Sequence, residues 1–235
     1  MSESFTYDNR TGRPPGRFVR ALSHVLPGVA RVWSRAEPYA DAWRAHNVAA
    51  LRRPGRRWIV LGDSMSQGVG ASAYDRGWVG QLAGRLAESG LDLQVINLSS
   101  TGARVRDVID QQLPVLAGLE SRGDDLVTVM VGSNDLFAGK ALRTALPSAY
   151  AELVSLVPHG SVVATLTQPP RAALRANEHV ELAAAEGAIV MVDLRVTGPS
   201  SWKGRLAPDL FHPNDSGYTA IATAFEPTVR AVLRN

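Results

Sequence analysis

The sequence predicts an α/β fold with a parallel sheet, preceded by a helical extension at the N-terminus. From Trp58 onward, short apolar runs alternate with stretches of helical spacing, the pattern of repeated βαβ units. The 235 residues, 45% hydrophobic and 20% charged, have the composition of one globular domain with an appendage. Small and polar residues follow several of the apolar runs, as expected where strands end at a functional edge.

Five apolar runs are predicted to be strands: 58–61, 93–97, 126–131, 162–166 and 189–192. Helical spacing follows each strand and predicts helices over 78–88, 105–117, 142–157, 172–186 and 217–233. Because parallel neighbours need a crossover connection, this strict alternation favours one parallel sheet covered by helices.

The first 57 residues lack the alternation of strand and helix patterns seen in the rest of the sequence. Residues 1–16 have no apolar period and are expected to form a loosely attached arm. A short basic amphipathic helix is predicted from Phe18 to Leu26, where Pro27-Gly28 interrupts the pattern. Pro38 is expected to open a second helix that ends near Leu51. We therefore divide the chain into an extension, 1–57, and a main domain, 58–235.

Charge distribution and cysteine content exclude several classes of protein function. Residues 1–57 hold 11 Arg against 4 Asp or Glu, so a +7 extension precedes a −4 remainder within a net charge of +3. The absence of cysteine excludes a disulfide framework, a thiolate metal site and a cysteine nucleophile. No apolar run reaches the roughly 18 to 20 residues that cross a bilayer, and the start lacks a secretory pattern. We expect a cytoplasmic protein.

Candidate catalytic residues follow the first and the last strand. Ser64, in Gly62-Asp63-Ser64, is the candidate nucleophile. His212 is the candidate base, and Asp209 would orient its ring and select the tautomer, as in a serine triad. Each has a structural alternative: a helix N-cap for the serine, a loop residue for the histidine and a turn cap for the aspartate.

Two further positions could stabilise a developing oxyanion. Gly102 follows the second strand and would offer a backbone N–H at close approach. Asn134 follows the third strand and could donate from its side-chain amide. Turn geometry and helix capping are the alternatives for these two residues.

Taken together, these motifs resemble the SGNH hydrolase family, also called GDSL esterases and lipases. The resemblance covers about residues 58–235. Met65 stands where the family most often has leucine, a change expected to alter packing more than chemistry. The matching blocks are Gly62-Asp63-Ser64-Met65, Gly102 in Ser-Ser-Thr-Gly-Ala, Gly132-Ser133-Asn134-Asp135 and Asp209-Leu210-Phe211-His212-Pro213.

The resemblance implies a fold and a set of roles. The fold is a flavodoxin-like three-layer α/β/α sandwich around five parallel strands. Ser64 is then the nucleophile, His212 the base and Asp209 its orienting carboxylate. The backbone N–H groups of Ser64 and Gly102 and the Asn134 side chain form the oxyanion hole. The implied reaction is hydrolysis of a carboxylic ester through an acyl-serine, with neither metal nor organic cofactor.

Other readings are less well supported. No Gly-x-Ser-x-Gly elbow, phosphate-binding loop, dinucleotide fingerprint or His-Glu-x-x-His motif occurs, and no nucleic-acid-binding motif accompanies the positive charge. Two alternatives remain. The same triad could serve an acyltransferase, or the fold could belong to a ligand-binding protein without catalysis. Nothing in the sequence indicates the oligomeric state.

Apolar residues near the motifs favour a small-molecule acyl or aryl ester as substrate, with core packing as the alternative explanation. They are Met65, Val69, Leu136, Phe137, Leu210 and Phe211, with Trp78 and Trp202 nearby.

The extension admits two accounts. Its basic helix could contact an anionic membrane surface. We favour the other account, in which the extension packs on the acidic main domain through Phe18, Leu22, Trp33, Tyr39 and Trp43.

Overall fold

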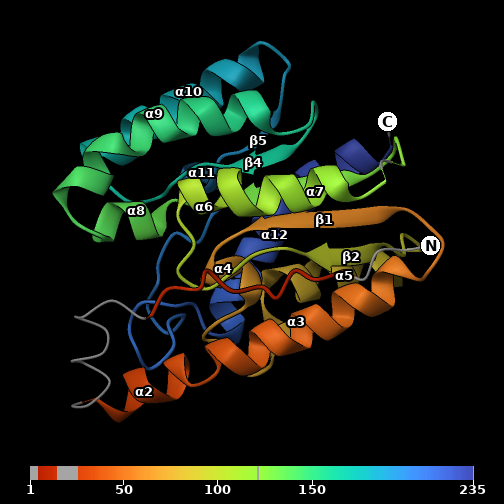
Figure 1. Ribbon diagram of the computed structural model, residues 1–235. Coiled ribbons are helices and arrows are strands. Elements are labelled where there is room, and N and C mark those ends of the chain that lie inside the picture. The colour runs from red at the N-terminus through yellow and green to blue at the C-terminus, as the bar shows by residue number, and fades with distance from the viewer. Residues whose placement is uncertain (1–4, 15–25, 121, 235) are drawn as a thin grey trace.

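A five-stranded parallel sheet forms the centre of the molecule, in the order β2-β1-β3-β4-β5 (Figure 1). The computed structural model describes residues 5–14, 26–120 and 122–234. The predicted five parallel strands are confirmed, each with ends within two residues of the expected ones. Their bounds are β1 Arg57–Gly62, β2 Gln94–Asn97, β3 Leu126–Met130, β4 Val162–Ala164 and β5 Val190–Val192.

Helices cover both faces of the sheet, because alternate strand side chains point to opposite sides. Ile59 and Leu61 pack toward α9 (Lys140–Leu156) and α10 (Arg171–Ala185). Trp58 and Val60 pack toward the opposite layer, built from α5 (Trp78–Glu88) and α12 (Asp215–Arg234). Figure 1 shows the two layers on either side of the strands. The expected three-layer α/β/α sandwich is confirmed.

The helix predicted over 105–117 is divided into three pieces. It consists of α6 (Val105–Asp107), a π-helical turn, η2 (Val108–Gln112), and α7 (Leu113–Gly118). Pro114 has no N–H for the Asp110 carbonyl, so the α-helical hydrogen bonds cannot continue through this point.

Several shorter elements were not predicted, because three to five residues are too few to show a helical period. They are α4 (Ser64–Gln67), η1 (Tyr74–Arg76), α8 (Ser133–Phe137) and α11 (Leu194–Thr197).

The extension contains helices on both sides of Ser34 in its described part. The helix predicted from Phe18 to Leu26 lies, except for Leu26, outside the described residues. A helix that was not predicted, α2 (Pro27–Trp33), begins at Pro27, since proline suits the first helical position, where an N–H has no partner. The second predicted helix is α3 (Ala36–Leu51), which begins two residues before Pro38. The boundary at residue 57 stays a prediction.

Helix α3 covers the edge of the sheet at β2. The side chain of Asn47 accepts a hydrogen bond from the Asn97 N–H and donates one to the Asn97 carbonyl, both at 2.8 Å. Asn9 donates to the same carbonyl at 2.6 Å. Trp43 is buried and donates from Nε1 to the Gln67 carbonyl at 3.0 Å. Residues of the extension thus belong to the core and take the place of a neighbouring strand.

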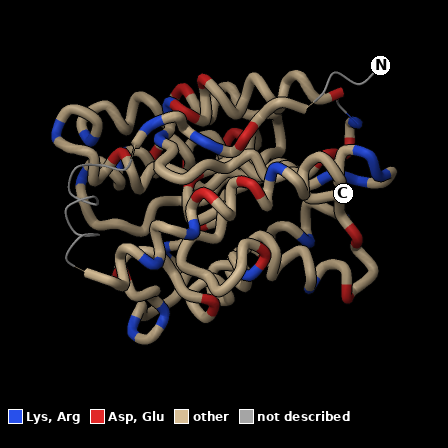
Figure 2. The backbone as a smooth tube through the Cα atoms, turned by 60° about the horizontal axis from the view of Figure 1, so that its bottom comes forward, with Lys and Arg blue, Asp and Glu red and all other residues tan. Residues whose placement is uncertain are grey.

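Charged residues of both signs are interspersed along the chain (Figure 2). The buried guanidinium of Arg57 pairs with Asp125 of the main domain. No helix within the described ranges is long and apolar enough to span a membrane.

Replacing Asn47 with alanine should lower the free energy of unfolding by about 1–3 kcal/mol, because the buried N–H of Asn97 loses its acceptor. Urea denaturation measures this change. The matched control is Arg44→Ala, at an exposed position of the same helix, which should change stability by less than about 0.5 kcal/mol. Equal effects of the two variants would contradict the assigned role of Asn47.

Candidate active site

Ser64 lies at the carboxyl edge of the sheet, where β1 turns into α4. Asp63 caps this helix by accepting the Met65 N–H at 3.0 Å. A Cβ on Gly62 would lie 2.4 Å from the Met130 carbonyl oxygen, so only glycine fits between the two strands. The side-chain amide of Gln112 bonds both the N–H and the carbonyl of Gly62, each at 2.8 Å. These contacts fix the backbone just before the serine.

His212 and Asp209 approach Ser64 from the loop before α12. His212 Nε2 lies 2.9 Å from Ser64 Oγ, and its Nδ1 lies 2.6 Å from Asp209 Oδ2. Asp209 Oδ1 also accepts the backbone N–H groups of Phe211 and His212, at 3.1 and 3.0 Å. Leu210 completes this tight turn with a left-handed φ of +56°. The structure therefore brings the three residues together in the order expected of a triad.

The surroundings of Asp209 favour its charged form. Burial alone would raise the pKa of this carboxyl, but the hydrogen bond and charge of His212, with the two backbone N–H donors, lower the pKa below its ordinary value. With the ring proton on Nδ1, His212 donates a hydrogen bond from Nδ1–H to the ionised Asp209. His212 Nε2 is then left with a lone pair directed at the serine hydroxyl.

The three groups expected to form the oxyanion hole can each donate a further hydrogen bond. Among the described residues, neither the Ser64 N–H nor the Gly102 N–H has a hydrogen-bond acceptor. Gly102 has a φ of +80°, a conformation that side-chain-bearing residues rarely adopt. Asn134 donates one amide proton to the Ala103 carbonyl at 2.8 Å, which leaves its second amide proton free to donate. Asn134 thereby contacts the loop that carries Gly102.

Aromatic side chains lie close to His212. Phe211 lies edge-on to His212 with ring centroids 5.0 Å apart, and Trp33 of α2 does the same at 6.0 Å. Phe137 contacts Phe211 at 5.5 Å and is 60% exposed. Leu210 is 79% exposed. These residues form an apolar rim next to His212.

The other apolar candidates belong to the core or lie at its margin. Val69, Leu136 and Trp78 are fully buried, and Trp78 stacks on Phe225 with centroids 4.2 Å apart. For these three residues core packing was the correct explanation. Met65 and Trp202 are partly buried against the same core cluster.

Two residues of the candidate site were not predicted from the sequence. Gln112 sits in the π-helical turn, and a lone glutamine carries no spacing signal. Trp33 was assigned only to packing, because nothing in the sequence places α2 beside a loop about 180 residues away.

Two further buried carboxyls have raised pKa values. Burial raises the pKa of Asp63 to about 7, with repulsion from Asp135 adding to the shift and one hydrogen bond from Met65 opposing it. Burial likewise raises the pKa of Asp135 to about 6. In the described ranges, no three His, Cys, Asp or Glu side chains are grouped to hold a metal ion.

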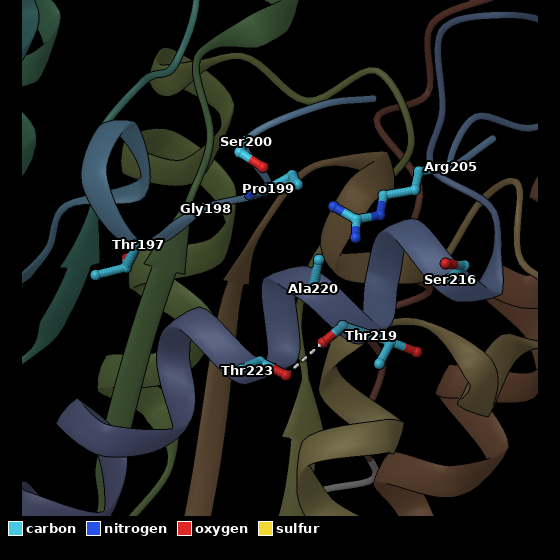
Figure 3. Close-up of a pocket in the computed structure, with 9 residues that line it drawn as sticks. All are labelled: Thr197, Gly198, Pro199, Ser200, Arg205, Ser216, Thr219, Ala220 and Thr223. Carbon is cyan, nitrogen blue, oxygen red and sulfur yellow. Dashed lines mark hydrogen bonds between the residues drawn. The ribbon is translucent and has the colours of Figure 1, made fainter. Parts of the chain in front are cut away.

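An open hollow lies between α11 and α12 (Figure 3). None of its lining residues belongs to the Ser64, His212 and Asp209 group. They are Thr197, Gly198, Pro199, Ser200, Arg205, Ser216, Thr219, Ala220 and Thr223.

Comparison with known proteins gives a consistent result. The sequence pattern that describes the GDSL-like Lipase/Acylhydrolase family matches residues 60–220, which is well over half of the chain. The chain belongs to this family. The protein is therefore an enzyme of the esterase and acylhydrolase type, and the match includes the segments that carry Ser64, Gly102, Asn134 and His212.

Individual relatives agree with the family. Esterase TesA from Pseudomonas aeruginosa is 35% identical over 74 residues, 28% of this chain and 36% of that protein. The match thus spans about a third of that relative. The crystal structure of TesA superposes with a TM-score of 0.60 at 25% identity and covers 76% of this chain and 100% of its own. The psychrotrophic esterase EstA from Pseudoalteromonas sp. shares the fold, with a TM-score of 0.58, 19% identity and coverage of 77% and 100%.

The protein should lose stability as pH rises from about 4 to about 7, because folded Asp63 binds a proton that the unfolded chain releases at its ordinary pKa of 3.8. Asp63→Asn keeps an acceptor for the Met65 N–H but removes this titration. The loss of unfolding free energy between about pH 5 and about pH 8 should therefore be smaller in Asp63→Asn than in the wild type.

Urea unfolding at the two pH values measures the difference. Glu88→Gln, which removes an exposed carboxyl on α5, serves as the control and should keep the wild-type pH dependence. An identical pH dependence in Asp63→Asn and the wild type would show that Asp63 does not hold a proton in this range.

Proposed function

We propose that the protein hydrolyses carboxylic esters through an acyl-serine intermediate, with Ser64, His212 and Asp209 as its catalytic triad. One observation carries the proposal. Ser64 Oγ, the two ring nitrogens of His212 and Asp209 Oδ2 form a continuous chain of hydrogen bonds, at 2.9 and 2.6 Å. These hydrogen bonds connect the end of β1 with a loop far away in the sequence. The membership of the protein in a hydrolase family supports a catalytic role for the three residues.

Acylation begins when Ser64 Oγ attacks the ester carbonyl. His212 Nε2 takes the serine proton, and the ionised Asp209 stabilises the imidazolium that forms. The tetrahedral intermediate then collapses. His212 returns the proton to the leaving alcohol, and the acyl group stays on Ser64.

Deacylation repeats these steps with water as the nucleophile. His212 takes a proton from the attacking water, and the second tetrahedral intermediate releases the acid as Ser64 regains its proton. In both halves the carbonyl oxygen gains negative charge. The N–H groups of Ser64 and Gly102 and the free amide proton of Asn134 are the donors that stabilise it.

The apolar rim supports an acyl or aryl ester as the substrate class. Phe211 and Trp33 present ring edges beside His212, and the exposed Phe137 extends the apolar surface from Phe211. Burying such surface against an apolar acyl chain or aromatic ring is favourable. Of the known relatives, TesA and EstA are described as esterases.

The wild type should hydrolyse p-nitrophenyl esters in a series from acetate to palmitate, and Ser64→Ala should not, because it lacks the nucleophile. Release of p-nitrophenol measures both activity and acyl preference. Ethanol or glycerol in the same assay separates hydrolysis from acyl transfer, since transfer yields a new ester. Undiminished activity in Ser64→Ala would contradict the serine mechanism. Inactivity of both proteins towards all esters would favour the alternative that the protein binds a ligand without catalysis.

Asn134→Ala should lower kcat by roughly 100- to 1,000-fold with little change in KM, the usual scale for one lost oxyanion donor. Gln168→Ala is the control, because Gln168 Nε2 donates to the Ser133 hydroxyl at 3.1 Å and, among the described residues, makes no hydrogen bond with Asn134. Near-normal turnover in Asn134→Ala would contradict its role as a donor.

A further inference from the structure

The N-terminal segment 5–14 lies along the loop that carries Gly102, defined here as the oxyanion loop, residues 98–104. Three of its side chains donate hydrogen bonds to backbone carbonyls of this loop. Tyr7 Oη donates to Leu98 at 2.8 Å, and Asn9 Nδ2 donates to Ser99 at 2.9 Å. Arg13 Nη2 donates to the carbonyl of Gly102 itself, at 3.0 Å. The segment therefore contacts the proposed catalytic machinery directly.

Arg13 also joins the oxyanion loop to the start of α6. Its Nη1 and Nη2 bond the two carboxylate oxygens of Asp107, each at 2.5 Å, in a bidentate pair. The Asp107 side chain is 8% exposed, and its Oδ2 also accepts the Arg104 N–H at 2.7 Å. The Arg13 guanidinium thus holds the oxyanion loop directly at Gly102 and, through Asp107, at Arg104.

Gly102 needs such a restraint. Its φ of +80° lies in a region where glycine is free to move, and a Cβ built on it would meet no atom within 4 Å. Packing therefore does not fix this residue, and hydrogen bonds must. The carbonyl bonded by Arg13 is one peptide away from the Gly102 N–H, and the next carbonyl, that of Ala103, orients Asn134. A shift of this loop would misdirect two of the three donors.

We propose that Arg13 is a positioning residue for ester hydrolysis, which holds the oxyanion loop so that Gly102 and Asn134 point at the developing oxyanion. It acts through the loop and does not itself bind substrate. The inference rests on the function proposed above and adds a residue that lies outside the family match at 60–220. It gives the N-terminal segment a part in turnover beyond packing.

The test compares Arg13→Met with Arg10→Met. Both variants remove a guanidinium from the same segment, but Arg10 bonds Glu37 and Asp41 of α3 and the Asp8 carbonyl, away from the oxyanion loop. Rates with a p-nitrophenyl ester are expressed per active site, with the burst of p-nitrophenol counting the sites that acylate. This normalisation removes any loss caused by unfolded protein.

Arg13→Met should lower kcat about 10- to 100-fold with KM unchanged, less than outright loss of a donor, because the donors remain but are poorly aligned. Arg13→Lys should fall between Arg13→Met and the wild type, since one ammonium cannot hold both Asp107 oxygens and the Gly102 carbonyl. In the Asn134→Ala background, Arg13→Met should cost less than it does alone, because both changes act on one oxyanion hole.

Each outcome decides the matter. The predicted fall in kcat, with reduced cost in the Asn134→Ala background, supports the proposal. A kcat per active site in Arg13→Met that equals that of Arg10→Met overturns it and leaves the segment a packing role, even if thermal unfolding occurs at a lower temperature. A wild type without Ser64-dependent hydrolysis overturns the proposed function, and the role of Arg13 with it.

Discussion

The contact between Ser64 and His212 joins residues 148 positions apart, and the surrounding loops are built to hold it. Gly70 brings the chain after α4 against the histidine loop, so closely that a Cβ would lie 2.8 Å from the His212 Cβ. The Tyr218 hydroxyl of α12 donates to the Val69 carbonyl at 2.5 Å, beside that same approach. The close packing of these two loops and α12 therefore holds Ser64 and His212 near each other.

Two buried aspartates near this contact show how local donors decide charge. Asp209 receives the His212 ring N–H and two backbone N–H groups, and these lower its pKa despite burial. Asp63 receives one backbone N–H, from Met65, and burial raises its pKa to about 7. The same side chain thus favours its charged form in one loop, whereas in the helix cap it keeps its proton up to about pH 7.

The parts that could be predicted from the sequence are those with a local signature. Alternating apolar runs gave the strands and layers, and the polar residues after each strand led to Ser64 and His212. Gln112, Trp33 and Arg13 could not be found in this way, because each acts through contacts between segments distant in the chain, and a single residue has no period or spacing. The burial of the apolar residues near the motifs was not predictable either, because the sequence alone does not distinguish a core residue such as Val69 from a rim residue such as Phe137.

The amide side chains of Asn9 and Asn47 occupy the backbone groups of Asn97 in β2, which is an edge strand. An uncovered edge is a template for strands of other molecules, so these two asparagines also protect the sheet from self-association. A shortened chain without the extension would expose that edge. Deleting the extension would therefore affect aggregation and the proposed catalysis at the same time. Single substitutions in the full-length protein allow the two effects to be measured separately.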